Sequence, residues 1–141
     1  ALSDNPQLDN RFYYGPSPIR VTIDRNGRLP SHLHLMDSKI PTLIFAYEAH
    51  ESSDHVQYAL LNKGNEELDQ VFRTLYSKNI GSVMIEGGAK LLGSCIRAGF
   101  WDECRVITSN TKLDHGIPAP TLPTVPFDQV YSITGDTVRT L

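Results

Sequence analysis

The chain has 141 residues, of which 40% are apolar and 21% are charged, and its formal net charge at pH 7 is -3. This length suits one domain with a sizeable hydrophobic core. The slightly acidic balance gives no reason to expect a nucleic-acid partner, and no apolar run approaches the roughly 20 residues that are needed to span a membrane.

The two cysteines, Cys95 and Cys104, are too few for a disulfide framework or a four-cysteine zinc site. Cys95 falls in an apolar helical stretch and Cys104 borders a strand, so we interpret both as reduced, buried thiols. No signal-peptide pattern opens the chain. We therefore expect a cytoplasmic protein without membrane association.

The first half of the chain predicts three strands and one helix. Short runs rich in β-branched or aromatic residues indicate strands at 19–24, 42–47 and 56–61. The stretch between the first two carries an Asn-Gly pair and two prolines, so it is mostly loop. Apolar residues spaced i, i+3, i+4 and i+7, with acids in the first turn, predict an amphipathic helix over 65–78.

The second half predicts a near-continuous apolar strand at 82–86, typical of a central strand covered on both faces. A helix over 89–99 follows, with Gly99 as its terminal glycine. A strand at 104–108 and a Pro-rich loop at 115–126 lead to a hairpin whose strands flank Gly135-Asp136. Strand–helix–strand units closed by a C-terminal antiparallel hairpin predict an α/β domain with a mixed sheet.

Glu86, Gly87 and Gly88 join the strand at 82–86 directly to the next helix. A helix N-terminus presents unpaired N–H groups and a partial positive charge, and glycines let a phosphate reach those amides. The glycines alone fit a simple tight turn equally well. Glu86 is costly to bury unless it is paired or faces a cleft, where it could accept hydrogen bonds from sugar hydroxyls; the alternative is that it caps neighbouring helix amides.

Histidines do not make a metal site in this sequence. His50 and His55 are five residues apart, which does not match the spacing of a zinc-binding helix. His32 and His34 supply only two ligands, with no evident third. No metal is expected.

Three stretches, "LSDNPQLDNR", "PIRVTIDRNGRLP" and "SVMIEGGAKLLGSCIRAGFWDE", together resemble the reductase domain of the bifunctional riboflavin-biosynthesis deaminase/reductase. They occur in that family's order, and the resemblance covers essentially the whole chain. It implies a dihydrofolate-reductase-like fold and NADPH-dependent reduction of the ribosyl group of 5-amino-6-(5-phosphoribosylamino)uracil to the ribityl product. A homodimer and a fused upstream deaminase domain are further implications.

The resemblance also implies site residues. The first acid of the family's opening segment lies at the cofactor, which here is Asp4. The leucine and arginine of that segment, here Leu8 and Arg11, contact the phosphorylated substrate, as does the acid before the glycines, Glu86. The cofactor is held by the glycine turn and the helix start, here Gly87, Gly88, Ala89, Lys90, Leu91, Leu92, Gly93 and Ser94.

The chemistry of these residue types agrees with such roles. The fork of Arg11 matches a sugar phosphate. Hydride transfer needs no protein nucleophile, so the protein must place the reactants and polarise the opened sugar; Asp4 is the first candidate for that polar role and Glu86 for orienting the ribose hydroxyls. Arg25 could pair with the 2′-phosphate of NADP, against the simpler interpretation of a solvated turn residue.

One departure and two alternatives complete the sequence-based hypothesis. The family's domain normally begins with a strand, a helix and another strand before the Asp-Asn-Pro turn, and this chain lacks them. We therefore expect a single, N-terminally truncated reductase-like domain over 1–141, and whether this piece is active stays open. The alternative functions are a non-catalytic nucleotide- or phosphate-binding module and a related pterin or folate reductase.

Overall fold

The structure, a computed structural model, describes residues 2–64 and 66–141. The chain divides into two compact units, one ending at Gly81 and the other spanning Ser82–Leu141. The first unit contains the three expected strands, which form a parallel sheet in the order β1 (Arg20–Ile23), β2 (Thr42–Ala46), β3 (Val56–Leu60).

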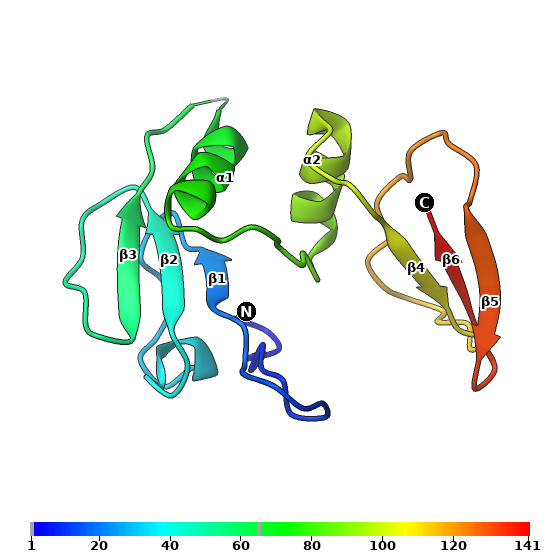
Figure 1. Cartoon of the computed structure of the whole chain (residues 1–141), viewed down its shortest axis with the longest axis horizontal. Coiled ribbons are helices and arrows are strands. Elements are labelled where there is room, and N and C mark those ends of the chain that lie inside the picture. Colours follow the sequence, from blue (N-terminus) through cyan, green and yellow to red (C-terminus); the bar gives the residue numbers. More distant parts are fainter. Residues whose placement is uncertain (1, 65) are drawn as a thin grey trace. The chain divides into compact units, whose positions relative to one another are not determined.

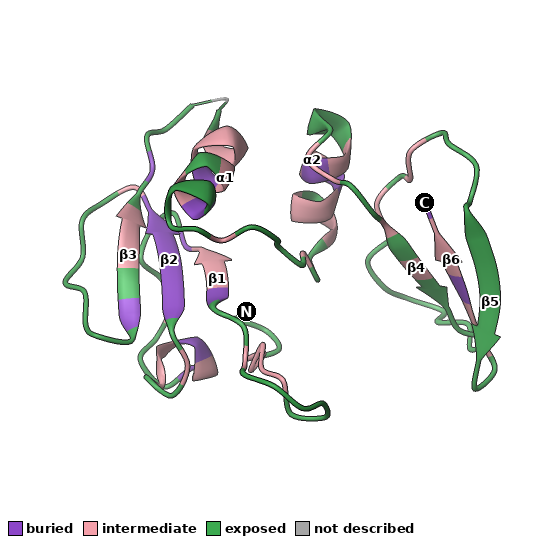
Figure 2. Ribbon diagram, viewed as in Figure 1, coloured by how far each residue is buried: buried purple, intermediate pink, exposed green. Residues whose placement is uncertain are grey.

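Helix α1 (Glu67–Ser77) packs on one face of this sheet (Figure 1). The helix predicted over 65–78 is confirmed over 67–77, and residue 65 lies outside the described residues. Its buried side chains, Val71 and Leu75, meet Leu43 and Phe45 of β2 in the core of the unit. Every residue of β2 is buried (Figure 2), as expected for the middle strand of a covered parallel sheet.

The connection between β1 and β2 is mostly loop, as predicted, and includes the short 3-10 helix η1 (His34–Met36). Leu33 and Leu35 are buried here, at 4% and 1% exposed. The connection is therefore held in place by its own apolar side chains, and its polar groups have fixed positions.

The second unit contains helix α2 (Ala89–Ala98) and the strands β4 (Arg105–Thr108), β5 (Gln129–Ile133) and β6 (Asp136–Thr140). Helix α2 ends at Gly99, which adopts a left-handed conformation with φ of 72°, as its sequence position predicted. The three strands form an antiparallel sheet in the order β4-β6-β5, and β5 and β6 make the predicted C-terminal hairpin. The α/β fold class is confirmed, with the parallel and antiparallel pairings in separate sheets.

The hairpin turn lies one residue earlier than predicted. Ile133 pairs with Asp136, so the two loop residues are Thr134 and Gly135, with φ of 48° and 94°. Two positive φ values in a two-residue loop match the twist of the flanking strands. Glycine therefore occupies the second position of the turn, and Asp136 begins β6.

The predicted strand at 82–86 is absent, and this prediction is wrong for the structure described. Residues 82–88 form no helix or strand, and Met84 is 81% exposed. A strand requires backbone hydrogen bonds from a neighbour, and within the described residues no strand pairs with this run. Apolar character alone could not supply that neighbour.

The two cysteines are free thiols. Cys95 is buried, and burial raises the pKa of its thiol, while Cys104 is only partly buried, which corrects that part of the prediction. In residues 2–64 and 66–141, no helix has the length and apolar character to cross a membrane. Over the same residues, no group of three or more His, Cys, Asp or Glu side chains could hold a metal ion.

Candidate functional site

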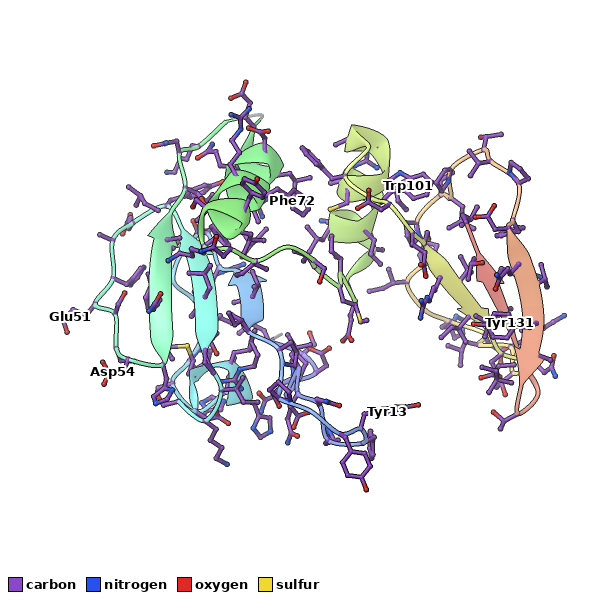
Figure 3. All side chains as sticks on the ribbon, in the orientation of Figure 1. Tyr13, Glu51, Asp54, Phe72, Trp101 and Tyr131 are labelled. Carbon is purple, nitrogen blue, oxygen red and sulfur yellow. The ribbon has the colours of Figure 1, made fainter. Side chains whose placement is uncertain are left out.

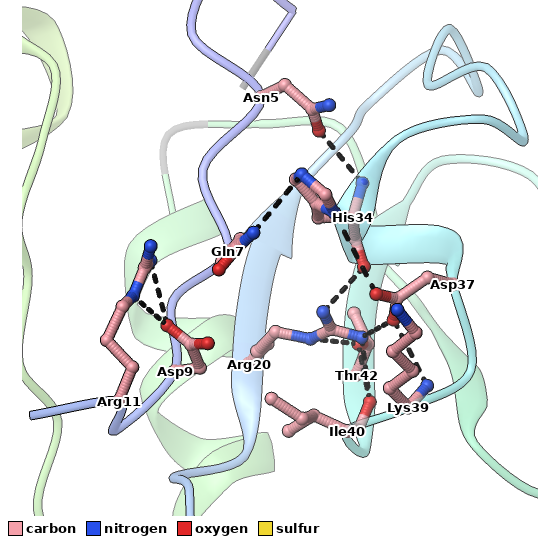
Figure 4. A network of polar contacts seen from close by, with 10 residues as sticks. All are labelled: Asn5, Gln7, Asp9, Arg11, Arg20, His34, Asp37, Lys39, Ile40 and Thr42. Atoms are coloured by element: carbon pink, nitrogen blue, oxygen red, sulfur yellow. Dashed lines mark hydrogen bonds and ion pairs between the residues drawn. The ribbon is translucent and has the colours of Figure 1, made fainter.

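The segment from Asp4 to Arg11 runs beside the connection that carries η1 (Figure 4). Two of its residues, Asn5 and Leu8, have positive φ values of 39° and 47°. Such backbone is uncommon for residues other than glycine and persists where surrounding contacts hold it. Asp4 and Arg11 are exposed and Leu8 is half-buried, so the residues expected to meet cofactor and substrate lie at the surface of this unit.

Arg11 is paired within the segment. Its Nε donates to Asp9 Oδ1 at 2.9 Å, and its Nη2 lies 2.8 Å from the same oxygen. The guanidinium also lies 5.8 Å from the ring centroid of Phe12. Phe12 begins an exposed aromatic tip with Tyr13 and Tyr14, and Tyr13 projects away from the ribbon (Figure 3). Asp9 thus orients Arg11, and a substrate phosphate would share the guanidinium with this carboxylate.

A buried arginine organises the neighbouring connection. Arg20, at the start of β1, is 2% exposed. Its guanidinium donates to Thr42 Oγ1 at 2.9 Å, to the carbonyl oxygens of His34 and Ile40 at 2.5 and 2.9 Å, and to Asp37 Oδ1 at 2.9 Å (Figure 4). The charge is therefore paired and each of the three guanidinium nitrogens donates a hydrogen bond, as a buried guanidinium requires.

Asp37 is the carboxylate of this network. Its desolvation raises the pKa, but the hydrogen bonds from the Lys39 backbone amide and from Arg20 outweigh that effect, so its pKa is lowered. The carboxylate therefore stays ionised, as its pairing with a buried cation requires.

Arg25 follows β1 and is also paired. Its Nε donates to Glu67 Oε2, at the start of α1, at 2.6 Å. The Tyr47 hydroxyl donates to the other oxygen of Glu67, and Lys63 lies 5.1 Å from the centre of the Tyr47 ring. The hydrogen bond to Glu67 raises the pKa of Arg25. Arg25 is thus a half-exposed cation with a carboxylate partner. It is neither an unpaired phosphate-binding group nor a fully solvated turn residue.

The start of α2 has the properties of an anion-binding site. Gly88 is the N-cap residue and no side chain caps the first turn, which contains no acid. A methyl group placed on Gly87 or Gly88 would meet no atom within 4 Å, so no side chain crowds the α-carbons of this turn. Lys90 adds a positive charge to the first turn. These residues fit a cofactor pyrophosphate: uncapped N–H groups, a favourable helix dipole and open glycine backbone.

The rest of the predicted cofactor segment continues along α2. Gly93 is buried, and a methyl group there would come within 3.2 Å of Arg97 Nη1 and 3.7 Å of Pro120 Cβ, so the Pro-rich loop lies next to the helix at this residue. The Ser94 hydroxyl donates to the Lys90 carbonyl at 2.9 Å, inside the helix. Glu86 is exposed just before the glycines, while Ala89, Leu91 and Leu92 are partly buried.

The structure thus places the predicted residues in two groups. Asp4, Leu8, Arg11 and Arg25 belong to the first unit, and Glu86 through Ser94 belong to the second. Sequence reasoning missed the residues that link the segment from Asp4 to Arg11 to the rest of the first unit, which are Asn5 and His34, with Arg20 and Asp37 behind them. One signal was available: a charged residue inside the apolar run at 19–24 implies a buried partner.

A family model described as "RibD C-terminal domain" matches residues 1–111 of this chain. A 2,5-diamino-6-ribosylamino-4(3H)-pyrimidinone 5′-phosphate reductase of Methanothermobacter thermautotrophicus is 31% identical over 118 residues, which is 75% of this chain and 53% of that protein. The reductase of the same description from Aquifex aeolicus is 28% identical over 113 residues, covering 74% and 50%. The chain spans about half the length of the curated relatives that it matches.

Solved structures share the fold of this chain. The crystal structure of a deaminase/reductase of Thermotoga maritima matches 99% of this chain and 41% of that one, with 25% identity and a TM-score of 0.81. The riboflavin biosynthesis reductase Rib7 of Saccharomyces cerevisiae matches 88% of this chain and 68% of its own, with 21% identity and a TM-score of 0.70. The predicted dihydrofolate-reductase-like fold is confirmed. Because the family model matches well over half of its residues, the chain belongs to the RibD C-terminal domain family.

Proposed function

We propose that the protein catalyses the NADPH-dependent reduction of the ribosyl group of a phosphoribosylaminopyrimidine, of the 5-amino-6-(5-phosphoribosylamino)uracil type, to a ribityl group. One observation carries the proposal: the family match over residues 1–111 includes both predicted parts of the site, the segment from Asp4 to Arg11 and the glycine-led start of α2. The relatives named as pyrimidinone 5′-phosphate reductases support the substrate class.

In this proposal the first turn of α2 binds the cofactor pyrophosphate through its uncapped amides, with Lys90 beside it. When bound, the reduced nicotinamide supplies a hydride equivalent. Arg11 binds the sugar phosphate, held in orientation by Asp9, and Leu8 packs against the substrate.

Two carboxylates then have polar roles. Asp4 polarises the opened sugar or supplies its proton, and Glu86 accepts hydrogen bonds from the ribose hydroxyls. Neither forms a covalent bond with the substrate. Both act by placing the sugar carbon and stabilising the charge that develops on it.

Arg25 is the proposed contact for the 2′-phosphate of NADPH. The ion pair with Glu67 holds the guanidinium in place after β1 and leaves it about half exposed, with a side-chain exposure of 52%. A phosphate at this position would share the arginine with Glu67. Replacing Arg25 by Gln should therefore weaken the binding of NADPH more than the binding of NADH. An equal loss of affinity for both cofactors would show that Arg25 does not contact the 2′-phosphate.

A homodimer, a cytoplasmic location and an upstream deaminase domain are included in the proposal. The Thermotoga maritima protein, of which this chain covers 41%, is described as both a deaminase and a reductase, which supports the fused domain. The relatives described only as reductases leave the unfused arrangement as the alternative outcome. Mass spectrometry of the natural protein would decide between them.

The activity is tested by following NADPH oxidation with the phosphorylated pyrimidine as substrate. Asp4→Asn and Glu86→Gln should each reduce turnover by about 100-fold or more while calorimetry still finds NADPH bound, since these carboxylates act on the sugar. NADPH binding without turnover by the unmodified protein would favour a non-catalytic binding module. Reduction of a pterin with no use of the phosphorylated pyrimidine would favour the pterin reductase alternative.

A further inference from the structure

Asn5 links the segment from Asp4 to Arg11 to a distant part of the first unit. Its side-chain oxygen Oδ1 accepts a hydrogen bond from the backbone N–H of His34 at 2.8 Å (Figure 4). The backbone of Asn5 has a φ of 39°, a conformation that asparagine tolerates better than most residues. The bond therefore depends on both the side chain and the backbone shape of this one residue.

His34 is a firm support for that bond. Its carbonyl oxygen accepts from the buried Arg20 at 2.5 Å and from the backbone N–H of Asp37 at 3.2 Å. The adjacent Leu35 side chain is 1% exposed, which fixes η1 against the unit. Asn5 is thus tied through His34 to a guanidinium that is itself held by the sheet.

A second contact joins the same two parts of the chain. Gln7 Nε2 lies 3.5 Å from His34 Nε2, so contacts on both sides of Pro6 reach one residue. The backbone at Leu8, one residue further on, has a φ of 47°. This conformation is unfavourable for leucine, and the local sequence does not compensate for its cost in free energy. Tertiary contacts must hold this shape, and two of them run from Asn5 and Gln7 to His34.

We propose that Asn5 is a positioning residue of the reductase site, whose amide oxygen fixes the segment that presents Asp4, Leu8 and Arg11. The inference rests on the proposed function, since it concerns the residues assigned there to cofactor and substrate. Asn5 acts through its neighbours, because its oxygen is engaged by the backbone of His34. Without this bond, the segment samples other conformations, and only a fraction of molecules presents Leu8 and Arg11 together.

The test compares three variants. Asn5→Ala removes the acceptor, and Asn5→Asp keeps an acceptor oxygen on a residue that tolerates the same backbone shape. Asn79→Ala is the matched control, because Asn79 also has a positive φ, of 60°, and is exposed, and its side chain has no hydrogen bond among the described residues. The two alanine variants should therefore lose similar stability from backbone strain.

We expect Asn5→Ala to raise the KM for the phosphorylated pyrimidine about fivefold, the effect of one net hydrogen bond, with a smaller change in kcat. Asn5→Asp should restore KM to within about twofold of the unmodified protein, and Asn79→Ala should leave it unchanged. Hydrogen exchange provides an independent measurement: the His34 amide should exchange faster in Asn5→Ala and stay protected in Asn5→Asp.

Other outcomes would overturn the inference. If Asn5→Ala and Asn79→Ala have the same KM, or if His34 exchange does not change, Asn5 does not position the segment. If the unmodified protein shows no substrate-dependent NADPH oxidation, the proposed function fails and the positioning role fails with it. An active unmodified protein with no effect at Asn5 overturns the positioning role alone, so the two failures are distinguishable.

Discussion

Replacing Arg20 by methionine should destabilise the first unit strongly. Methionine has a similar length and suits a buried position, so the substitution removes the guanidinium without leaving a large cavity. Four hydrogen bonds are lost, those to Thr42, His34, Asp37 and Ile40. Removing one partner of a buried ion pair is costly because the other charge remains.

The size of this destabilisation depends on which hydrogen bonds the former acceptors of Arg20 retain. The His34 carbonyl retains the amide of Asp37, the Ile40 carbonyl retains the Thr42 hydroxyl, and Asp37 retains the amide of Lys39. No acceptor is fully orphaned, so each lost bond counts near its net value of about 1 kcal/mol. Part of the free energy lost with these four bonds is offset, because the variant no longer has to bury the guanidinium charge. We expect a loss of about 3 kcal/mol in the free energy of unfolding.

Urea unfolding followed by circular dichroism measures this loss. Arg73→Met is the matched control, because Arg73 is 80% exposed and pairs with Asp69 on the surface of α1, where a change within about 0.5 kcal/mol is expected. The single tryptophan, Trp101, lies in the second unit, so its fluorescence reports whether that unit is affected. A loss below about 1 kcal/mol for Arg20→Met would refute the claim that this network holds the connection in place.

Three further predictions concern stability. Desolvation raises the pKa of Glu67, but hydrogen bonds from Tyr47 and Arg25 outweigh this effect, so the pKa is lowered. The stabilisation by these bonds is therefore present above about pH 4.5 and is lost as the pH falls further. The difference in the free energy of unfolding between the unmodified protein and Glu67→Gln should shrink on acid titration, and a constant difference would contradict this. Gly99→Ala should cost about 1 kcal/mol in thermal unfolding, because its φ is 72°, and no loss would contradict that strain. Leu75→Ala should cost about 2–5 kcal/mol in urea unfolding, since Leu75 is 1% exposed, and a smaller loss would mean that the core refills the space.

The elements of the first unit could be predicted because each has a local pattern. The spacing of Val71, Phe72 and Leu75 indicates the helix directly, and the β-branched runs indicate the strands. The run at 82–86 has an equally strong apolar pattern but forms no strand, because strand formation depends on a partner that periodicity does not report. The hairpin was predicted correctly, and its turn was displaced by one residue because Thr134 adopts a positive φ that sequence statistics disfavour.

The site was predicted unevenly for a related reason. Short motifs predict roles for Asp4, Arg11, Glu86 and the glycines, because a resemblance to a family rests on contiguous residues, and these roles stay predictions. The network of Arg20 joins residues 14 to 22 positions away, and the bond from His34 to Asn5 joins residues 29 positions apart. No spacing rule reaches across such separations. Only the structure could show that the expected substrate-binding segment is linked through His34 to a buried guanidinium.

In the proposed reaction, the protein transfers a hydride from NADPH to the sugar of a phosphoribosylaminopyrimidine. The most direct test uses NADPH carrying deuterium at both C4 positions, with mass spectrometry of the product. We expect a ribityl product with one deuterium on the carbon that was the ribosyl C1. NADPH oxidation without deuterium on that carbon, or an unchanged ribosyl group, would contradict it.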